Sequence, residues 1–99
     1  MIAPEKALRI LREHKAELKA KGVRRAAVFG SVSRGEARAD SDLDVLIEID
    51  HVARLTVFEL VRIKRAVAGL FPGRVDVVNA GSLKSGVART AKRDAVYAF

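Results

Sequence analysis

Apolar residues along this chain recur at two different spacings, which predict helices and strands in alternation. A stripe at three- and four-residue intervals predicts a first helix over residues 4–21, ended by Gly22. A second stripe predicts a helix over residues 56–70, in which Thr56 and Glu59 form a capping box. In this helix Val57, Leu60, Val61, Val67 and Phe71 are expected to share the buried side with Lys64 and Ala68.

Shorter apolar runs rich in β-branched residues predict three strands, over residues 23–29, 42–50 and 74–79. In the second of them alternate side chains point to opposite faces. Leu43, Val45, Ile47 and Ile49 occupy one face, and Asp42, Asp44, Leu46 and Glu48 the other. One face of the sheet is therefore expected to be covered, and the other to be partly available for chemistry.

The remaining segments complete a single domain over residues 1–99. Residues 32–37 are expected to form a short helix and residues 83–93 a last helix, and residues 94–99 an edge strand or a partner-binding tail. The fold class is then α/β (α+β), a small mixed sheet of three to four strands packed with helices. The helical crossover lets the second and third strands run parallel, while the relative direction of the first two is left open.

Composition narrows the class of protein without identifying it. The chain of 99 residues is 49% hydrophobic and 31% charged, which is typical of a soluble globular domain. No apolar run approaches the roughly 20 residues of a membrane span, and Glu5 and Lys6 interrupt any signal-peptide core. We therefore expect a cytoplasmic protein without a membrane partner. The absence of cysteine excludes disulfides and thiolate metal sites.

The charge is unevenly distributed along the chain. The net charge is +7, yet residues 26–50 hold six Asp and Glu against two Lys and Arg. These acidic residues belong either to a solvated loop or to a metal-binding centre. In the second case the surrounding basic surface would attract a polyanion or an acidic partner.

Candidate chemistry is concentrated between Gly30 and Asp44. Asp42 and Asp44 share one face at the start of a strand, where a divalent cation is the usual reason to tolerate two carboxylates. The turn at Gly30 and Ser31 offers backbone N–H groups to an anion such as phosphate. Asp76 lies within a β-branched run, and can complete a site for two cations if its strand lies beside the second strand. Alternatively, Asp76 is a surface residue paired with a nearby cation.

Other motifs with similar residues fail at required positions. The glycine spacing of Gly30 and Gly35 matches a P-loop, but Glu36 and Ala37 stand where lysine and a hydroxyl residue are needed. An EF-hand loop starting at Asp40 would need glycine at the position of Val45. No motif links the two histidines to a serine, so serine-nucleophile catalysis is not supported.

The two elements Gly30-Ser31-x-x-Arg34-Gly35 and Ser41-Asp42-x-Asp44, followed by Asp76 in a β run, closely resemble the nucleotidyltransferases of the DNA polymerase β superfamily. The small size and the long N-terminal helix resemble the minimal nucleotidyltransferases, the MNT or MntA-type proteins, over nearly the whole chain. The resemblance implies the polymerase β-like nucleotidyltransferase fold. It implies a cytoplasmic transferase that moves AMP from ATP, with magnesium, to a tyrosine of a HEPN-domain RNase toxin, for which it serves as antitoxin.

The same resemblance assigns roles to individual residues. Gly30 and Ser31 would hold the β- and γ-phosphates of ATP, and Asp42 and Asp44 would bind two Mg²⁺ ions. Asp76 would complete the site of the metal that activates the acceptor hydroxyl. Arg34 would contact phosphate, or would instead pair with Asp40 or Glu36.

Two other kinds of function stay open. An enzyme with a small-molecule or nucleic-acid acceptor fits the same site, although 99 residues leave little material for an acceptor-binding domain. The basic surround keeps nucleic acid as an option that is not favoured. A non-catalytic antitoxin that acts by contact alone is the other alternative, and the complete set of three carboxylates argues against it.

Overall fold

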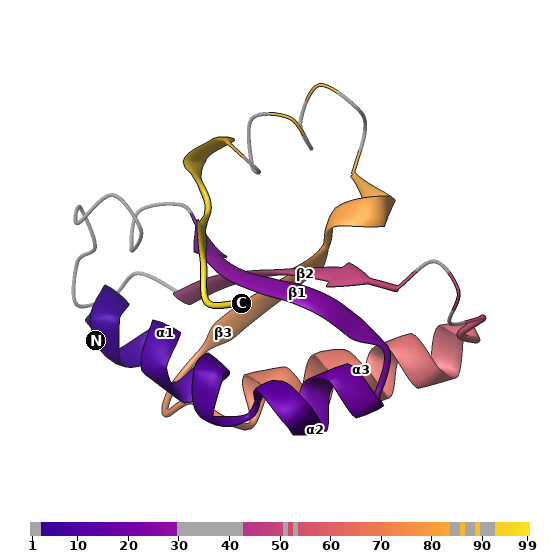
Figure 1. Cartoon of the computed structure of the whole chain (residues 1–99), viewed down its shortest axis with the longest axis horizontal. Coiled ribbons are helices and arrows are strands. Elements are labelled where there is room, and N and C mark those ends of the chain that lie inside the picture. The colour runs from indigo at the N-terminus through magenta and orange to yellow at the C-terminus, as the bar shows by residue number, and fades with distance from the viewer. Residues whose placement is uncertain are drawn as a thin grey trace.

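The computed structural model describes residues 3–29, 43–50, 52, 54–83, 86, 89 and 93–99. Three α-helices lie on one side of a sheet, and the short 3₁₀ helix that follows the third strand lies on the other side (Figure 1). The elements in chain order are α1 (Pro4–Glu13), α2 (Lys15–Ala20), β1 (Val23–Phe29), β2 (Leu43–Ile49), α3 (Val57–Ala68), β3 (Val75–Asn79), the 3₁₀ helix η1 (Ala80–Ser82) and β4 (Val96–Tyr97).

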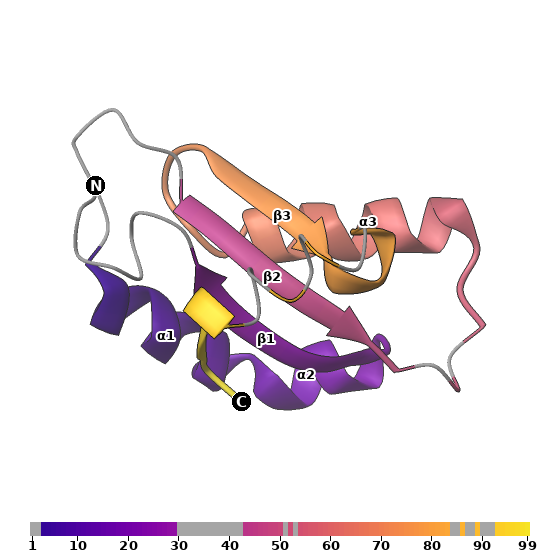
Figure 2. The same ribbon diagram turned by 90° about the horizontal axis from the view of Figure 1, so that it is seen from above.

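The sheet has four strands in the order β3-β2-β1-β4. β2 and β3 run parallel, which the helical crossover allowed, and α3 makes that crossover (Figure 2). β1 is antiparallel to β2 and to β4, which decides the direction that the sequence left open. The prediction of a mixed sheet of three to four strands is confirmed, and the C-terminal segment supplies the edge strand β4.

The core lies mainly between the sheet and the helices. The face of β2 that carries Leu43, Val45 and Ile47 packs against Leu11, Leu18 and Ile63 and their neighbours, as its alternation predicted. A smaller cluster on the opposite face contains Ala27, Leu46 and Ala80, with Tyr97 and Val78 packed against it. The second face is therefore only partly covered by the described residues.

The first helix is divided where a single helix over residues 4–21 was predicted. His14 separates α1 from α2, with φ of −105° and ψ of 13°. Its backbone N–H donates to the carbonyl of Leu11, and its Nδ1 lies 2.8 Å from the carbonyl oxygen of Ile10. These local contacts replace the regular i to i−4 backbone hydrogen bond of an α-helix at this one residue. Leu11 and Leu18, on either side of it, both remain buried. Gly22 follows α2 with φ of 106°, the conformation expected of a residue that ends a helix.

The capping box of α3 is present as predicted, but the buried side of this helix differs from the prediction. Thr56 Oγ1 accepts from the N–H of Glu59, and the Glu59 carboxylate accepts from the N–H of Thr56. Val67 and Phe71 are buried as predicted. Val57 and Val61, which were also expected on the buried side, are 75% and 40% exposed, and Ile63 is buried instead. The helix packs against β3 at the end of the sheet, so only the narrow side that carries Ile63 and Val67 reaches the core.

Some predicted elements cannot be compared with the structure. The short helix over residues 32–37 lies outside the described residues, as does most of the last helix predicted over residues 83–93. Among the described residues, no helix is both long and apolar enough to cross a membrane.

Candidate active site

The tertiary structure brings two of the three predicted carboxylates side by side. Asp44 of β2 and Asp76 of β3 are direct partners in the register of the parallel pair. Neighbouring strands lie about 4.8 Å apart, and partners in register point to the same face. Asp44 is half-buried and Asp76 is exposed. The expectation that Asp76 faces the same side as Asp44 is confirmed.

The strand alternation explains why these two groups point away from the helices. Their neighbours Val45 and Val77 pack toward the helical side, so Asp44 and Asp76 project from the opposite, partly covered face. Two carboxylates at this spacing repel each other in the absence of a cation. The carboxylate oxygens of Asp44 and Asp76 are ligands of the kind that Mg²⁺ requires.

The end of β1 lies at the same point of the sheet. Phe29, its last residue, is the register partner of Asp44. The chain therefore leaves β1 beside Asp44, and β2 begins directly after Asp42 in the sequence. Gly30, Ser31, Arg34 and Asp42 themselves lie outside the described residues, so their roles stay predictions. Within the described part of the chain, no group of three metal-type ligands occurs.

A polar cluster at the far end of the same face was not recognised from the sequence. Glu48 is buried, and its carboxylate accepts from Arg24 Nη2 at 3.1 Å and from the Tyr97 hydroxyl at 2.8 Å. The Arg25 guanidinium lies 3.8 Å from the centroid of the Tyr97 ring. These contacts fasten β4 to the edge of the sheet. The adjacent arginines in an otherwise apolar run were the available signal. The sequence does not show, however, that Arg24 meets Glu48, 24 residues away, or that Glu48 meets Tyr97, a further 49 residues along the chain.

The hydrogen bond of Tyr97 predicts how stability depends on alkaline pH. Burial, followed by the hydrogen bond and the negative charge of Glu48, raises the pKa of Tyr97 above its usual value of 10.0. A raised folded-state pKa adds stability that is complete below the unfolded value and is lost as pH rises through the folded value. Tyr97→Phe is therefore expected to cost about 1 kcal/mol of unfolding free energy at pH 8. Above pH 10.0 this difference from the wild type should shrink.

Urea denaturation of both proteins between pH 8 and pH 11 measures this difference. The titration of lysines affects both proteins alike and cancels in the comparison. A difference that stays constant across this range would contradict the assigned role of the Tyr97 hydroxyl.

The fold agrees with comparisons to known proteins. The model of the nucleotidyltransferase domain family matches residues 11–98, so the chain belongs to this family. The chain is 46% identical over 99 residues to the protein adenylyltransferase MntA of Thermococcus cleftensis, covering 98% of this chain and 97% of that protein. The prediction of a nucleotidyltransferase enzyme is thereby confirmed.

Solved structures support the same class. A structure described as a minimal nucleotidyltransferase superposes with a TM-score of 0.75 at 40% identity, covering 96% of this chain and 95% of the other. A chain of the complex of tri-AMPylated Shewanella oneidensis HEPN toxin with MNT antitoxin superposes with a TM-score of 0.61 at 14% identity, covering 93% of this chain and 71% of that chain. At that identity the second likeness shows the fold alone.

Proposed function

We propose that this chain is a magnesium-dependent protein adenylyltransferase that transfers AMP from ATP to a tyrosine hydroxyl of a HEPN-domain RNase toxin, and so acts as its antitoxin. The observation that carries the proposal is the pairing of Asp44 with Asp76 in a chain of the nucleotidyltransferase family. The name of the Thermococcus relative and the AMPylated toxin in the Shewanella complex support the choice of a protein acceptor.

Transfer of AMP requires the chain to position ATP and the acceptor hydroxyl and to stabilise the charge that develops on the reacting oxygens. The acceptor oxygen bonds to the α-phosphorus of ATP while the bond from that phosphorus to the bridging oxygen breaks, and pyrophosphate leaves. In this proposal Asp76 would help take the proton of the acceptor hydroxyl, and the turn at Gly30 and Ser31 would hold the leaving phosphates. Asp42, Asp44 and Asp76 would hold two Mg²⁺ ions, whose charge stabilises the attacking and leaving oxygens.

The proposal is tested by incubating the purified chain with ATP, Mg²⁺ and the HEPN-domain protein from the same genome. Intact mass spectrometry should show the HEPN protein gaining one or more AMP groups, and tandem spectra should place them on tyrosine. Removing the metal with EDTA should abolish the gain, and restoring Mg²⁺ in excess should return it.

The outcome separates the proposal from its alternatives. Transfer to an aminoglycoside or to an RNA 3′ end, with none to the HEPN protein, would replace the proposed acceptor. If calorimetry detects no binding of ATP with Mg²⁺ while the HEPN protein still binds, a non-catalytic antitoxin replaces the enzyme.

A further inference from the structure

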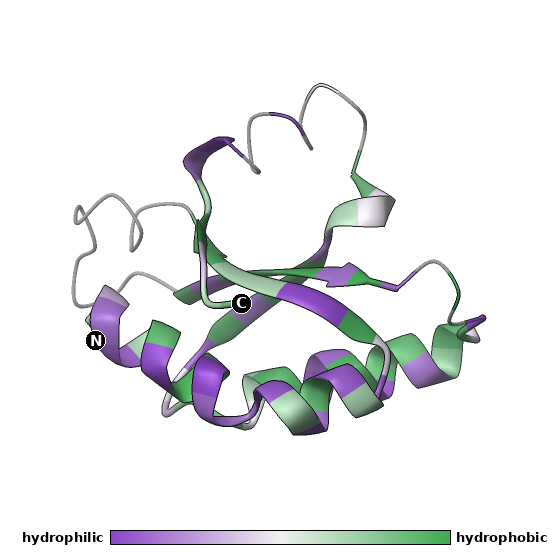
Figure 3. Cartoon of the chain, viewed as in Figure 1, coloured by the Kyte–Doolittle hydropathy of each residue, from purple (hydrophilic) through white to green (hydrophobic). Residues whose placement is uncertain are grey.

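Exposed apolar side chains gather at the beginning of α3 and just before it. Among the described residues, the large apolar side chains that are exposed are Val52, Val57, Phe58, Val61 and Val96. Four of the five fall between residues 52 and 61, and Phe58 is 79% exposed. Figure 3 shows this hydrophobic stretch at the first turns of α3, at the end of the helix farthest from the N-terminus of the chain. Val61 faces β3, where it lines one pocket with Val75 and Val77, whereas Val52 lines another, between α2 and α3. Val52 and the highly exposed Phe58 are therefore the apolar side chains that mark a candidate interaction surface.

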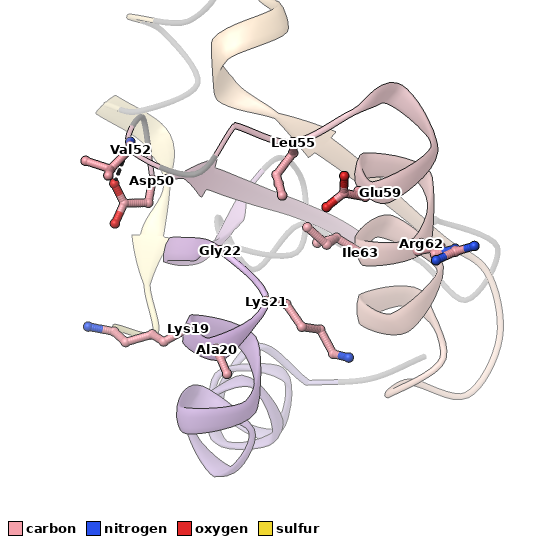
Figure 4. A pocket seen from close by; sticks show the side chains of 10 residues that line it. All are labelled: Lys19, Ala20, Lys21, Gly22, Asp50, Val52, Leu55, Glu59, Arg62 and Ile63. Carbon is pink, nitrogen blue, oxygen red and sulfur yellow. Dashed lines mark hydrogen bonds between the residues drawn. The ribbon is translucent and has the colours of Figure 1, made fainter.

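A pocket of about 620 Å³ adjoins this cluster between the end of α2 and the beginning of α3. Leu55 and Ile63 supply apolar lining, and Lys19, Lys21 and Arg62 are spread around it (Figure 4). An apolar pocket flanked by cations suits an apolar anchor side chain that has acidic neighbours.

The acidic side chains of the pocket are already engaged in local hydrogen bonds. Asp50 Oδ1 accepts from the N–H of Val52 at 3.0 Å. The Glu59 carboxylate accepts from the N–H and the hydroxyl of Thr56. In contrast, Lys21 and Arg62 form no ion pair with any part of the chain that the structure describes. Two cations at the rim therefore remain available to an incoming carboxylate.

We infer that this surface, formed by Phe58, Val52 and the pocket between Lys21 and Arg62, docks an acidic segment of the protein acceptor. An apolar side chain of that segment enters between Leu55 and Ile63, and its carboxylates pair with Lys21 and Arg62. A second copy of this chain is a poor occupant, because a two-fold contact would set one cationic rim against another in a protein of net charge +7. The inference rests on the proposed function, since it assigns a docking surface to the proposed acceptor.

The docking surface is remote from the carboxylate pair. Asp44 lies near the start of β2, and Asp50 follows the end of the same strand. Six residues of extended chain separate them by roughly 20 Å. An acceptor held at this surface is captured away from the reacting atoms, so loss of the surface should raise KM for the acceptor and leave kcat unchanged.

Two variants remove the two kinds of contact separately. Phe58→Ser removes an apolar side chain that the folded chain leaves in solvent. The double substitution Lys21→Glu/Arg62→Glu reverses the charge at the rim of the pocket. Each is expected to raise KM for the HEPN-domain protein about tenfold or more, with kcat within twofold of the wild type. The rise for the charge variant should diminish as salt is increased, because ions screen exposed charges.

Matched controls exclude general effects of charge and size. Lys6→Glu/Arg9→Glu makes the same change of net charge on the exposed side of α1 and should leave KM unchanged. Phe58→Leu keeps an apolar side chain and should retain most of the affinity. Thermal melting and calorimetry with ATP and Mg²⁺ check that each variant is folded and that its nucleotide site is intact.

The results distinguish this inference from the proposed function. If both test variants transfer AMP with the KM of the wild type, the docking surface is wrong and the transferase stands. If the wild type binds the HEPN-domain protein without transferring AMP, the transferase is wrong. The same variants then test docking through the dissociation constant: a rise of tenfold supports it, and an unchanged value overturns it.

Discussion

Asp44→Asn and Asp76→Asn are each expected to lower kcat for AMP transfer by about a thousandfold or more. The carboxamide keeps the size of the side chain but lacks the negative charge that attracts a divalent cation. Because Asp44 and Asp76 are register partners on one face, each substitution removes one of two adjacent charges. Steady-state assays with the acceptor protein measure the loss.

The same two variants should differ from the wild type in their response to metal. A bound cation stabilises the folded chain by about 2.7 kcal/mol at a concentration of one hundred times its dissociation constant. Mg²⁺ with ATP should therefore raise the melting temperature of the wild type and raise that of the variants much less. Without metal, Asp76→Asn should melt no lower than the wild type, because the repulsion between the two carboxylates is relieved.

A control and a contrary result complete this test. Glu17→Gln makes the same chemical change on an exposed side chain of α2 and should leave kcat and the metal response unaltered. Wild-type turnover by Asp44→Asn would refute the assignment of the carboxylate pair as the catalytic centre.

Ile47→Ala is expected to destabilise the folded chain by about 3 kcal/mol. Ile47 is fully buried in β2, between Ala26 of β1 and Asn79 of β3, and belongs to the cluster beneath the helices. Such a loss is a large share of the roughly 5–15 kcal/mol that holds a domain folded. Urea denaturation should show a lower midpoint with an unchanged slope.

The edge strand provides the comparison for this substitution. Val96→Ala on β4 removes apolar atoms from a side chain that is already 43% exposed, and should cost less than about 1 kcal/mol. Equal losses at the two positions would show that the cluster around Ile47 is not the main source of stability.

Local patterns in the sequence were sufficient to place the carboxylates that the structure describes. Because side chains alternate along a strand, Asp44 and Val45 point to opposite faces of the sheet in any fold that covers one face of β2. The crossover through α3 allowed β2 and β3 to run parallel, and the register of that pair, which the sequence left open, put Asp76 on the same face as Asp44. The polar residues between Gly30 and Asp42 were singled out by the spacing of their motif, and their arrangement stays a prediction.

Contacts between distant segments could not be inferred in the same way. Nothing in the run around Arg24 and Arg25 indicates that Glu48 and Tyr97 will meet there, because their pairing depends on the antiparallel contacts of β1 with both β2 and β4. The docking surface likewise arises where the end of α2 meets the beginning of α3, across about forty residues of chain.

The sequence by itself determined the strands, the capped helix, the face that carries Asp44 and the identity of the family, because alternation, capping and motif spacing are properties of neighbouring residues. The sequence also placed Val67 in the core, but only the tertiary structure decided that Ile63 joins it in place of Val57 and Val61. A helix at the end of a sheet turns toward the strands that it covers, so Ile63 and Val67 enter the core while Val57, Phe58 and Val61 stay in solvent. The surface that we propose for the acceptor exists because of that rotation.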